Sequence, residues 1–458
     1  MFISDLYKIF LEHPLITTDS RDVPKGSMFF ALKGDNFDGN QYAVPSLEKG
    51  ASYAVVDNNE IYSNAPSGIK NRILLVDDVL STLQQLANHH RCQLGTTIIG
   101  VTGTNGKTTT KELIAAVLSK KYNVLYTQGN FNNHIGVPKT LLRLTKEHQI
   151  AVVEMGANHP GEIKTLVNIV QPDYGIITNV GKAHLLGFGS FEGVIRTKGE
   201  LYDYLREDKG TVFINNDNEH LKGISHDLNL IRYGQKGDGD LLVQGEFIEC
   251  NPFLKFLWHS LSEEETKEFT IQTKLIGSYN IDNALAAACI GTFFAVPAQD
   301  ICDAISEYTP SNNRSQLTLT KDNRLVVDAY NANPTSMNAA LQNFRLMKAD
   351  HKMCILGDMG ELGEVSQDEH KKILALLREC AFEQVWLVGD EFKKALDSQL
   401  STQPSLPVQE ESEWGCRLST FPNVDAVKAE IAKSKPTDKT ILIKGSNYTK
   451  LYQVVEFL

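Results

Sequence analysis

The stretch GVTGTNGKTTT, residues 100–110, decides the fold of this chain. It continues the β-branched run TTII, which is typical of a buried strand, and leads into KTTTKELIAAVLSKK, where Leu113 and Val117 recur at helical spacing. A strand, a glycine turn and a helix start are the setting of a phosphate-binding loop, whose backbone N–H groups hold a phosphate at the positive end of the helix. The usual spacing requires a glycine where Val101 stands, so the sequence predicts a variant of this loop.

Each part of the loop has an expected role in binding ATP. Gly103 and Gly106 permit backbone angles and a close approach that side chains forbid. Lys107 is expected to neutralise the β- and γ-phosphate oxygens, and the Thr108 hydroxyl to bind Mg²⁺. The alternative is an ordinary turn with a surface lysine, which the combination Gly-Lys-Thr-Thr after a β-branched run disfavours. The predicted nucleotide-binding residues of the loop are Gly103, Thr104, Asn105, Gly106, Lys107, Thr108 and Thr109.

Strand-like and helix-like stretches alternate along the chain, which predicts an α/β protein. At 458 residues the chain is too long for one ordinary core. We expect three domains: a small N-terminal α/β domain at 1–94, a central P-loop domain with a mostly parallel sheet at 95–310, and a C-terminal Rossmann-like α/β domain at 311–458. The polar, turn-rich stretch TPSNNRSQ, residues 309–316, is the expected linker between the last two domains.

Composition restricts the class of protein. Hydrophobic residues make up 42% and charged residues 22%, as in globular proteins, and no apolar run approaches the roughly 20 residues of a membrane span. The formal net charge of −11 argues against nucleic-acid binding, so any phosphate must be held by a local cluster of basic groups and N–H groups. Seven scattered cysteines and no secretory signal predict a cytoplasmic protein with reduced thiols, and we expect a monomer.

Three polar residues lie near the predicted strands that follow the loop. Glu154 ends the strand-like run IAVVE, where a carboxylate can hold a Mg²⁺ shared with phosphates, although a solvated acid fits this position equally well. His184 lies just past the next strand, and Lys198 lies in the helix-like stretch VIRTKGELYDYL. Because a lone histidine is usually structural and a helical lysine is usually solvated, position alone assigns no role to these two residues.

The strings TGTNGKTTT, GSYNIDNALAA and VIRTKGE together resemble the Mur ligase family, which includes the folylpolyglutamate synthases. These are ATP-dependent enzymes that form amides. The resemblance implies that Glu154 binds magnesium, that His184 assists a second metal, and that Lys198 reacts with CO₂ to form a carbamate that reaches the second Mg²⁺. The carbamate chemistry needs an uncharged amine, so burial or neighbouring cations must lower the pKa of Lys198.

The same resemblance implies further nucleotide contacts. Asn283 matches an asparagine that reads adenine, although Tyr279 stands where the family has a histidine, and Arg196-Thr197 replace the small residues usual before the reactive lysine. In the expected linker, Arg314 is a candidate clamp for the γ-phosphate, against the alternative of a surface arginine. In the string DAYNANPTSM the candidate nucleotide contacts are Asp328, for the ribose hydroxyls, and Asn331 and Asn333.

Five strings, one of them already named, suggest the substrate specificity. The stretch DSRDVPKGSMFFALKG resembles a uridine-nucleotide-binding N-terminal domain, and GNFNNHIGVP resembles a muramoyl-peptide site. DAYNANPTSM and LGDMGELG resemble the Mur ligase that adds the last residues, a dipeptide, to the muramoyl peptide. LIKGS is a candidate contact for that dipeptide. The implied substrate-binding residues are Ser20 and Arg21 for the UDP moiety, Asn132 and Asn133 for the muramoyl peptide, and Lys444 and Ser446 for the dipeptide.

The reaction implied by the resemblance joins D-alanyl-D-alanine to UDP-N-acetylmuramoyl-tripeptide through an acyl phosphate, with ATP and two Mg²⁺ ions. The implied catalytic residues are Lys107, Glu154, His184, Lys198 and Arg314. A sister ligase that adds the third amino acid, and a folylpolyglutamate synthase, are the nearest alternatives. A P-loop binding protein without synthetic chemistry is the alternative from another class. The sequence leaves open whether the third residue of the acceptor peptide is diaminopimelate or lysine.

Overall fold

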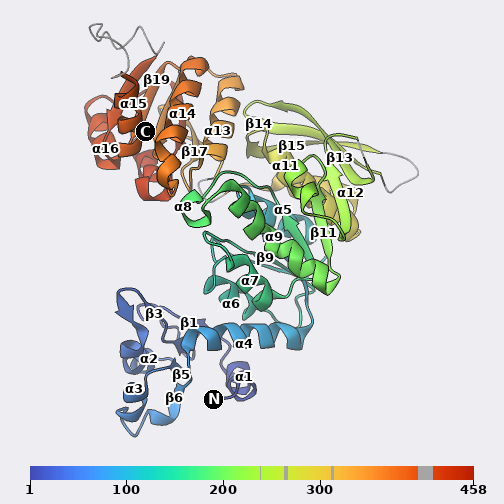
Figure 1. Cartoon of the computed structure of the whole chain (residues 1–458), viewed down its shortest axis with the longest axis vertical. Coiled ribbons are helices and arrows are strands. Elements are labelled where there is room, and N and C mark those ends of the chain that lie inside the picture. The colour runs from blue at the N-terminus through green and yellow to red at the C-terminus, as the bar shows by residue number, and fades with distance from the viewer. Residues whose placement is uncertain (238, 262–266, 311–313, 401–415) are drawn as a thin grey trace.

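Three α/β domains follow one another along the long axis of the molecule in the computed structural model (Figure 1). The structure describes residues 1–237, 239–261, 267–310, 314–400 and 416–458. The predicted fold class is confirmed. The expected linker lies partly outside the described residues, at 311–313, and the exact domain boundaries stay predictions. Within the described part of the chain, no helix has the length and apolarity that crossing a membrane requires.

The N-terminal domain is built on a small parallel sheet. Its strands occur in the order β1 (Ile16–Thr17), β2 (Met28–Phe30), β5 (Tyr53–Val56) and β6 (Ile73–Leu75). The short hairpin β3 (Lys33–Gly34) and β4 (Phe37–Asp38) stands apart from this sheet. The helices are α1 (Ile3–Glu12), α2 (Ala43–Lys49), α3 (Asn59–Ser63) and the long α4 (Val79–Leu94), which runs between this domain and the central one (Figure 1).

The central domain contains a nine-stranded sheet in the order β15-β14-β13-β12-β11-β10-β7-β9-β8. Its parallel part comprises β7 (Thr97–Thr102), β8 (Val124–Tyr126), β9 (Ile150–Glu154), β10 (Tyr174–Ile177), β11 (Thr211–Asn215), β12 (Asn229–Gly234) and β13 (Leu241–Cys250). The strands β14 (Phe253–Ser260) and β15 (Glu268–Ile276) extend it in antiparallel fashion, an extension that the sequence did not predict. The chain leaves β7 first toward β8 and β9 and later toward β10, so the edge where β7 ends is a topological switch point, where open α/β sheets bind ligands.

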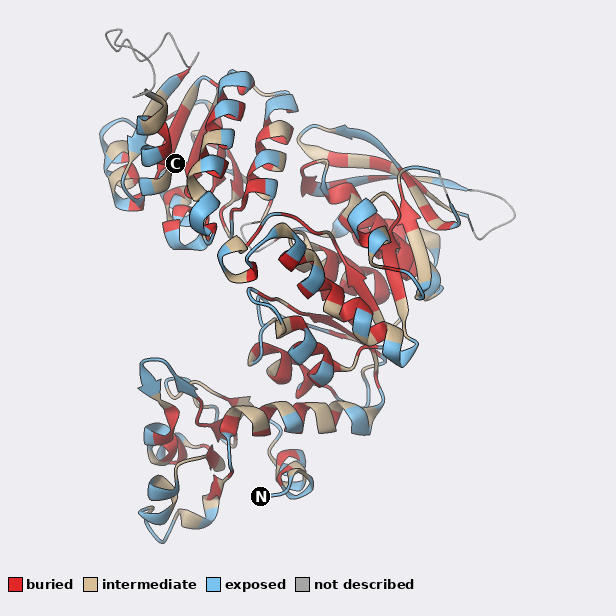
Figure 2. Ribbon diagram, viewed as in Figure 1, coloured by how far each residue is buried: buried red, intermediate tan, exposed pale blue. Residues whose placement is uncertain are grey.

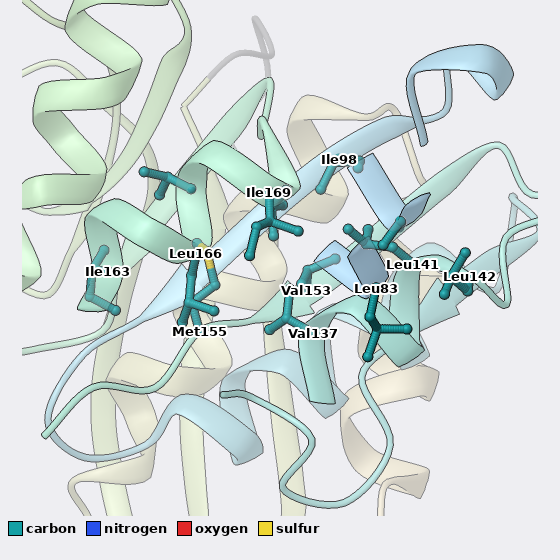
Figure 3. Close-up of a cluster of buried hydrophobic side chains, with 14 of the residues drawn as sticks. Leu83, Ile98, Val137, Leu141, Leu142, Val153, Met155, Ile163, Leu166 and Ile169 are labelled. Carbon is teal, nitrogen blue, oxygen red and sulfur yellow. The ribbon is translucent and has the colours of Figure 1, made fainter. Parts of the chain in front are cut away.

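Helices cover both faces of this sheet, because successive strand residues point to opposite sides. Ile98 packs in the cluster with α4, α6 (Gly136–Leu141), α7 (Glu162–Val170) and α9 (Phe191–Asp208), and Figure 3 shows it with Leu83 and Leu166. Its neighbour Ile99 packs in the opposite cluster, with α5 (Lys107–Leu118), α11 (Asn280–Phe293) and α12 (Ala298–Glu307). The short helices α8 (Leu185–Phe188) and α10 (Glu219–Gly223) complete the domain. Since α4 also packs against the N-terminal sheet, it joins two domains in one core.

The C-terminal domain has a six-stranded sheet in the order β16-β17-β21-β18-β19-β20, parallel except for β16. The strands are β16 (Gln316–Leu319), β17 (Asn323–Asp328), β18 (Lys352–Gly357), β19 (Gln384–Val388), β20 (Arg417–Phe421) and β21 (Lys439–Lys444). The helices are α13 (Pro334–Leu346), α14 (Ser366–Cys380), α15 (Asp390–Leu400) and α16 (Val424–Lys433). Figure 2 shows the inner strands of this sheet buried and the outer helix faces exposed.

Leu205 on α9 provides a test of this packing. The side chain is fully buried between two glycines, since a Cβ at Gly175 or Gly210 would lie 2.5 Å from one of its methyl groups. We expect Leu205→Ala to destabilise the central domain by about 2–5 kcal/mol, because the neighbouring backbone cannot collapse into the space left behind. Scanning calorimetry of the full chain measures this change. Leu261→Ala, at an exposed site in the same domain, should stay within about 0.5 kcal/mol, and equal melting of the two variants would contradict the packing described.

Candidate active site

The predicted phosphate loop lies between the end of β7 and the start of α5. Two neighbouring side chains explain why glycine is needed at positions 103 and 106. Gly103 has φ +142°, and a Cβ there would lie 2.1 Å from Thr178 Oγ1. Gly106 has φ +78°, and a Cβ there would lie 2.5 Å from Asn283 Oδ1. That oxygen accepts a hydrogen bond from Thr110 Oγ1 at 2.9 Å and so has little freedom to withdraw. Both glycines are therefore needed for the loop to fit between β10 and α11.

Lys107 is the first residue of α5, and its side chain turns back over the loop. Its Nζ donates to the carbonyl oxygens of Gly103 and Thr104 at 2.8 and 3.0 Å. Removal from water lowers the pKa of Lys107 to about 8, with the nearby Glu154 carboxylate opposing and the Arg314 guanidinium adding to the shift. The amine is therefore still mostly protonated at neutral pH, and it can exchange these carbonyls for phosphate oxygens.

Thr108 and Glu154, the two residues predicted to bind the first magnesium, lie side by side. Glu154 is 1% exposed, and its Oε1 accepts hydrogen bonds from Thr108 Oγ1 at 3.3 Å and from Asn132 Nδ2 at 2.8 Å. Its Oε2 is buried and has no hydrogen-bond partner among the described residues, while Lys111 Nζ lies 3.9 Å away. A hydroxyl beside a carboxylate oxygen that lacks a partner fits a Mg²⁺, which prefers oxygen ligands.

His184 and Lys198, predicted for the second metal, both lie near Phe188 of α8, whose ring centre is 6.3 Å from that of His184. His184 has φ +50°, and its Nδ1 forms a hydrogen bond to Glu361 Oε2 from the C-terminal domain. Burial lowers the pKa of His184, and the Glu361 carboxylate opposes that shift.

Lys198 is 2% exposed on α9, so its amine is buried rather than solvated. Its Nζ donates to Ala157 O at 3.2 Å and lies 5.3 Å from the centre of the Phe188 ring. Burial, followed by repulsion from Lys107, lowers the pKa of Lys198 well below its usual value. An uncharged amine is the form that reacts with CO₂, so the environment suits the carbamate expected from the sequence.

A cavity of about 950 Å³ brings most of the predicted site residues together between the central and C-terminal domains. It is also bordered by Leu80 and Gln84 of α4. Predicted residues that line it are Thr104, Asn105, Gly106, Lys107, Thr109, Asn132, Asn133, Glu154, His184, Asn283, Arg314, Asp328, Asn331 and Lys444.

The C-terminal wall of the cavity carries cations and their partners. Asp328 and Lys444 end the adjacent strands β17 and β21, and Lys444 Nζ donates to Asp328 Oδ2 and, at 3.4 Å, to Asn331 O. The Arg314 guanidinium lies 3.8 Å from the centre of the Tyr330 ring, and its buried Nε has no hydrogen-bond partner among the described residues. A stacked guanidinium with an unused donor is suited to an anionic group in the cavity.

Several predicted contacts have structural tasks of their own. Asn333 caps α13 through Ser336 N, at 2.9 Å, and its Nδ2 donates to Asn105 Oδ1 at 2.8 Å. Asn133 Oδ1 accepts from Gly136 N at the start of α6, at 2.9 Å. The amide of Asn283 has partners within the protein at both atoms, so reading adenine requires it to exchange one of them.

Three predicted substrate residues do not line this cavity. Ser446 is buried, and its hydroxyl donates to Asp358 O, behind the C-terminal wall. Ser20 and Arg21 lie in the N-terminal domain, where the Arg21 side chain is exposed and pairs with Asp19 at 2.8 Å. Their roles stay predictions.

Two residues near the site were missed by the sequence reasoning. Lys111 follows Lys107 by four residues, hence on the same face of α5, and its buried Nζ donates to Thr127 O at 2.7 Å beside Glu154. The spacing could have indicated it. Glu361 stands in LGDMGELG, a string noted for its resemblance alone. An acid shortly after a predicted strand of the C-terminal sheet could have been considered as a site residue.

Gly106→Ala tests whether the loop needs its glycine to bind phosphates. The new methyl group would need the left-handed backbone and would meet the fixed Asn283 oxygen, so we expect ATP affinity to fall at least about tenfold. Calorimetric titration with ATP and Mg²⁺ measures it. Gly95→Ala carries the same backbone penalty at φ +64° but meets nothing within 4 Å, and it should bind ATP normally. Equal affinity of the two variants would show that the loop does not hold the nucleotide.

Family models match each domain of the chain. They are described as Mur ligase family, catalytic domain, at residues 14–91, Mur ligase middle domain at 101–291, and Mur ligase, glutamate ligase domain, at 313–447. The UDP-N-acetylmuramoyl-tripeptide–D-alanyl-D-alanine ligase of Bacillus subtilis is 36% identical over 82% of this chain and 79% of its own length. The ligase of the same name from Escherichia coli is 33% identical over 82% of this chain and 81% of its own length.

Solved structures agree with these relatives. A crystal structure of MurF from Acinetobacter baumannii superposes with a TM-score of 0.81 at 30% identity, covering 96% of this chain and 92% of that one. The predicted family is confirmed: the chain belongs to the Mur ligase family.

Proposed function

We propose that the chain is an ATP-dependent amide ligase that joins D-alanyl-D-alanine to the terminal carboxylate of UDP-N-acetylmuramoyl-tripeptide, in the synthesis of peptidoglycan. The observation that carries the proposal is the cavity between the domains. It combines the phosphate loop and Glu154 of the central domain with Arg314 and Lys444 of the C-terminal domain. Relatives that bear the name of this ligase match about four-fifths of the chain, which supports the choice of substrates.

The first step activates the carboxylate, which is a poor electrophile. One carboxylate oxygen of the tripeptide attacks the γ-phosphorus of ATP. The bond from that phosphorus to the β-bridging oxygen breaks, ADP leaves, and the carboxylate becomes an acyl phosphate. Two anions must meet for this reaction, so catalysis rests on positioning and on neutralising charge. Lys107 at the start of α5 and Arg314 on the facing wall supply fixed positive charges in the cavity.

In the second step the neutral amine of D-alanyl-D-alanine attacks the acyl carbon, giving a tetrahedral intermediate. Inorganic phosphate leaves, the nitrogen loses a proton, and the peptide bond remains. Lys444, held beside Asp328 on the C-terminal wall, is our candidate for orienting the carboxylate of the dipeptide. Water would destroy the acyl phosphate, so the C-terminal domain has to cover the cavity during the reaction.

The donor groups of the central domain suit two magnesium ions. Thr108 and Glu154 would hold one. His184, which lines the cavity, would hold the other together with a carbamate on Lys198, which lies beside α8 and is not among the residues that line the cavity. Bound there, Mg²⁺ supplies positive charge that offsets the phosphates. Because an imidazole and an amine offer no oxygen ligand, the second site depends on the carbamate for its oxygen atoms.

Phosphate release from ATP and Mg²⁺, with each substrate omitted in turn, tests the function. We expect release only when both UDP-N-acetylmuramoyl-tripeptide and D-alanyl-D-alanine are present, with mass spectrometry showing the pentapeptide product. Release with a single amino acid in place of the dipeptide would identify a sister ligase instead. ATP binding without release under any pairing would favour a non-catalytic nucleotide-binding protein.

The carbamate has its own test, because the amine of Lys198 is deeply buried and burial lowers its pKa. In ¹³C-bicarbonate we expect a protein-bound carbamate signal that disappears in Lys198→Met, together with a loss of phosphate release of about 100-fold. Lys164→Met, at an exposed lysine on the neighbouring helix α7, should retain both signal and activity. A signal that survives Lys198→Met would assign the carbamate to another amine and remove it from the proposed mechanism.

A further inference from the structure

Glu361 of the C-terminal domain reaches across the domain boundary to His184 of the central domain. Its Oε2 accepts the hydrogen bond from His184 Nδ1, and its backbone carbonyl accepts one from Leu186 N at 3.1 Å. In Figure 1 the helix α8, which begins just after His184, lies against the C-terminal domain. Side chain and backbone of one residue therefore bind the same short segment of the other domain.

The loop that carries Glu361 is fixed at its base. Asp358 accepts hydrogen bonds from the backbone N–H groups of Glu391 and Phe392, at 3.0 and 2.9 Å, at the start of α15. Met359 N donates to Nε2 of the fully buried His370 at 3.1 Å. Glu361 itself has φ +60°, an uncommon conformation for a residue with a side chain, and such backbones persist where the surroundings impose them. The carboxylate is thus presented by a rigid support.

The contact also determines which nitrogen of His184 is free. An ionised carboxylate only accepts hydrogen bonds, so Nδ1 must be the nitrogen that carries the proton. Nε2 of the neutral ring then keeps its lone pair, and His184 lines the cavity. A carboxylate behind a metal-binding histidine fixes the tautomer and orientation of the ring and raises its basicity as a ligand.

We propose that Glu361 is a positioning residue for the second cation site, holding His184 as the Nδ1-protonated tautomer so that Nε2 binds the cation only when the C-terminal domain is docked. This inference rests on the proposed function only in assigning His184 to a cation. In this role the Glu361 side chain couples docking of the C-terminal domain to metal binding at His184. The neighbouring interdomain ion pair between Lys182 Nζ and Glu369, at 3.1 Å, does not include His184, and neither of its residues lines the cavity, so it provides a matched control.

Binding of Mn²⁺, an EPR-visible substitute for Mg²⁺, tests the proposal in the presence of a non-hydrolysable ATP analogue and bicarbonate. We expect Glu361→Gln, which keeps an acceptor but removes the charge, and Glu361→Ala, which removes both, to weaken the weaker of two Mn²⁺ sites by about 10–100-fold. The loss should be larger in the alanine variant. Glu369→Gln should leave both sites unchanged. Equal Mn²⁺ affinities in wild type and both Glu361 variants would overturn the proposal, as would an equal loss in Glu369→Gln.

Nitrogen NMR of ¹⁵N-histidine-labelled full-length protein gives a readout that a merely structural contact would not change. The signals of the His184 ring are those that disappear in His184→Gln. In the wild type we expect Nδ1 of this ring to carry the proton, and in Glu361→Ala we expect a mixture of the two tautomers. An unchanged Nδ1-protonated ring in that variant would overturn the proposal. Neither measurement uses the peptide substrates. If the ligase assay fails while these effects occur, the substrate assignment is wrong and the role of Glu361 stands.

Discussion

The site depends on one constraint of packing: the backbone between β7 and α5 must pass closer to its neighbours than any side chain allows. Thr178, directly after β10, occupies the space beside Gly103, and Asn283 on α11 occupies the space beside Gly106. Those two neighbours come from the sheet and from the helix layer that covers it. The shape of the loop therefore depends on how the sheet and the helix layer pack around it, and the positive start of α5 faces the cavity.

Several lysine side chains are buried around the cavity. The chain has a net charge of −11, yet Lys111, Lys198 and Lys444 are each at most 2% exposed near the cavity. Each donates to a backbone carbonyl, which compensates part of the cost of removing an amine from water. The compensation is incomplete at Lys198, for which no ion pair occurs among the described residues, and burial together with repulsion from Lys107 lowers the pKa of its amine. A protein that repels anions at long range thus gathers basic side chains where phosphates are expected to bind.

Local sequence predicted the parts of the site that depend on single strands and turns. Glu154 was placed correctly at the end of a buried strand, because carboxyl ends of parallel strands meet at one edge, and the phosphate loop followed from its strand, glycines and helix start. Contacts between distant segments were beyond the reach of such patterns. The pairing of Lys444 with Asp328 requires β17 and β21 to be neighbours, and Ser446, two residues later, points behind the wall toward Asp358. The antiparallel strands β14 and β15 were missed because the length and spacing of a strand in the sequence do not indicate which strand it pairs with.

Two helix starts from different domains face the same cavity, and this arrangement links substrate binding to domain position. Lys107 begins α5, while Thr335 and Ser336 in the first turn of α13 line the opposite side. Asn333 caps α13 and also donates to Asn105 of the phosphate loop, so the two helix ends are joined by one side chain. Both ends carry partial positive charge and repel one another weakly without an anion between them. A polyphosphate in the cavity reverses the sign of that interaction, so the nucleotide itself is expected to stabilise the docked position of the C-terminal domain.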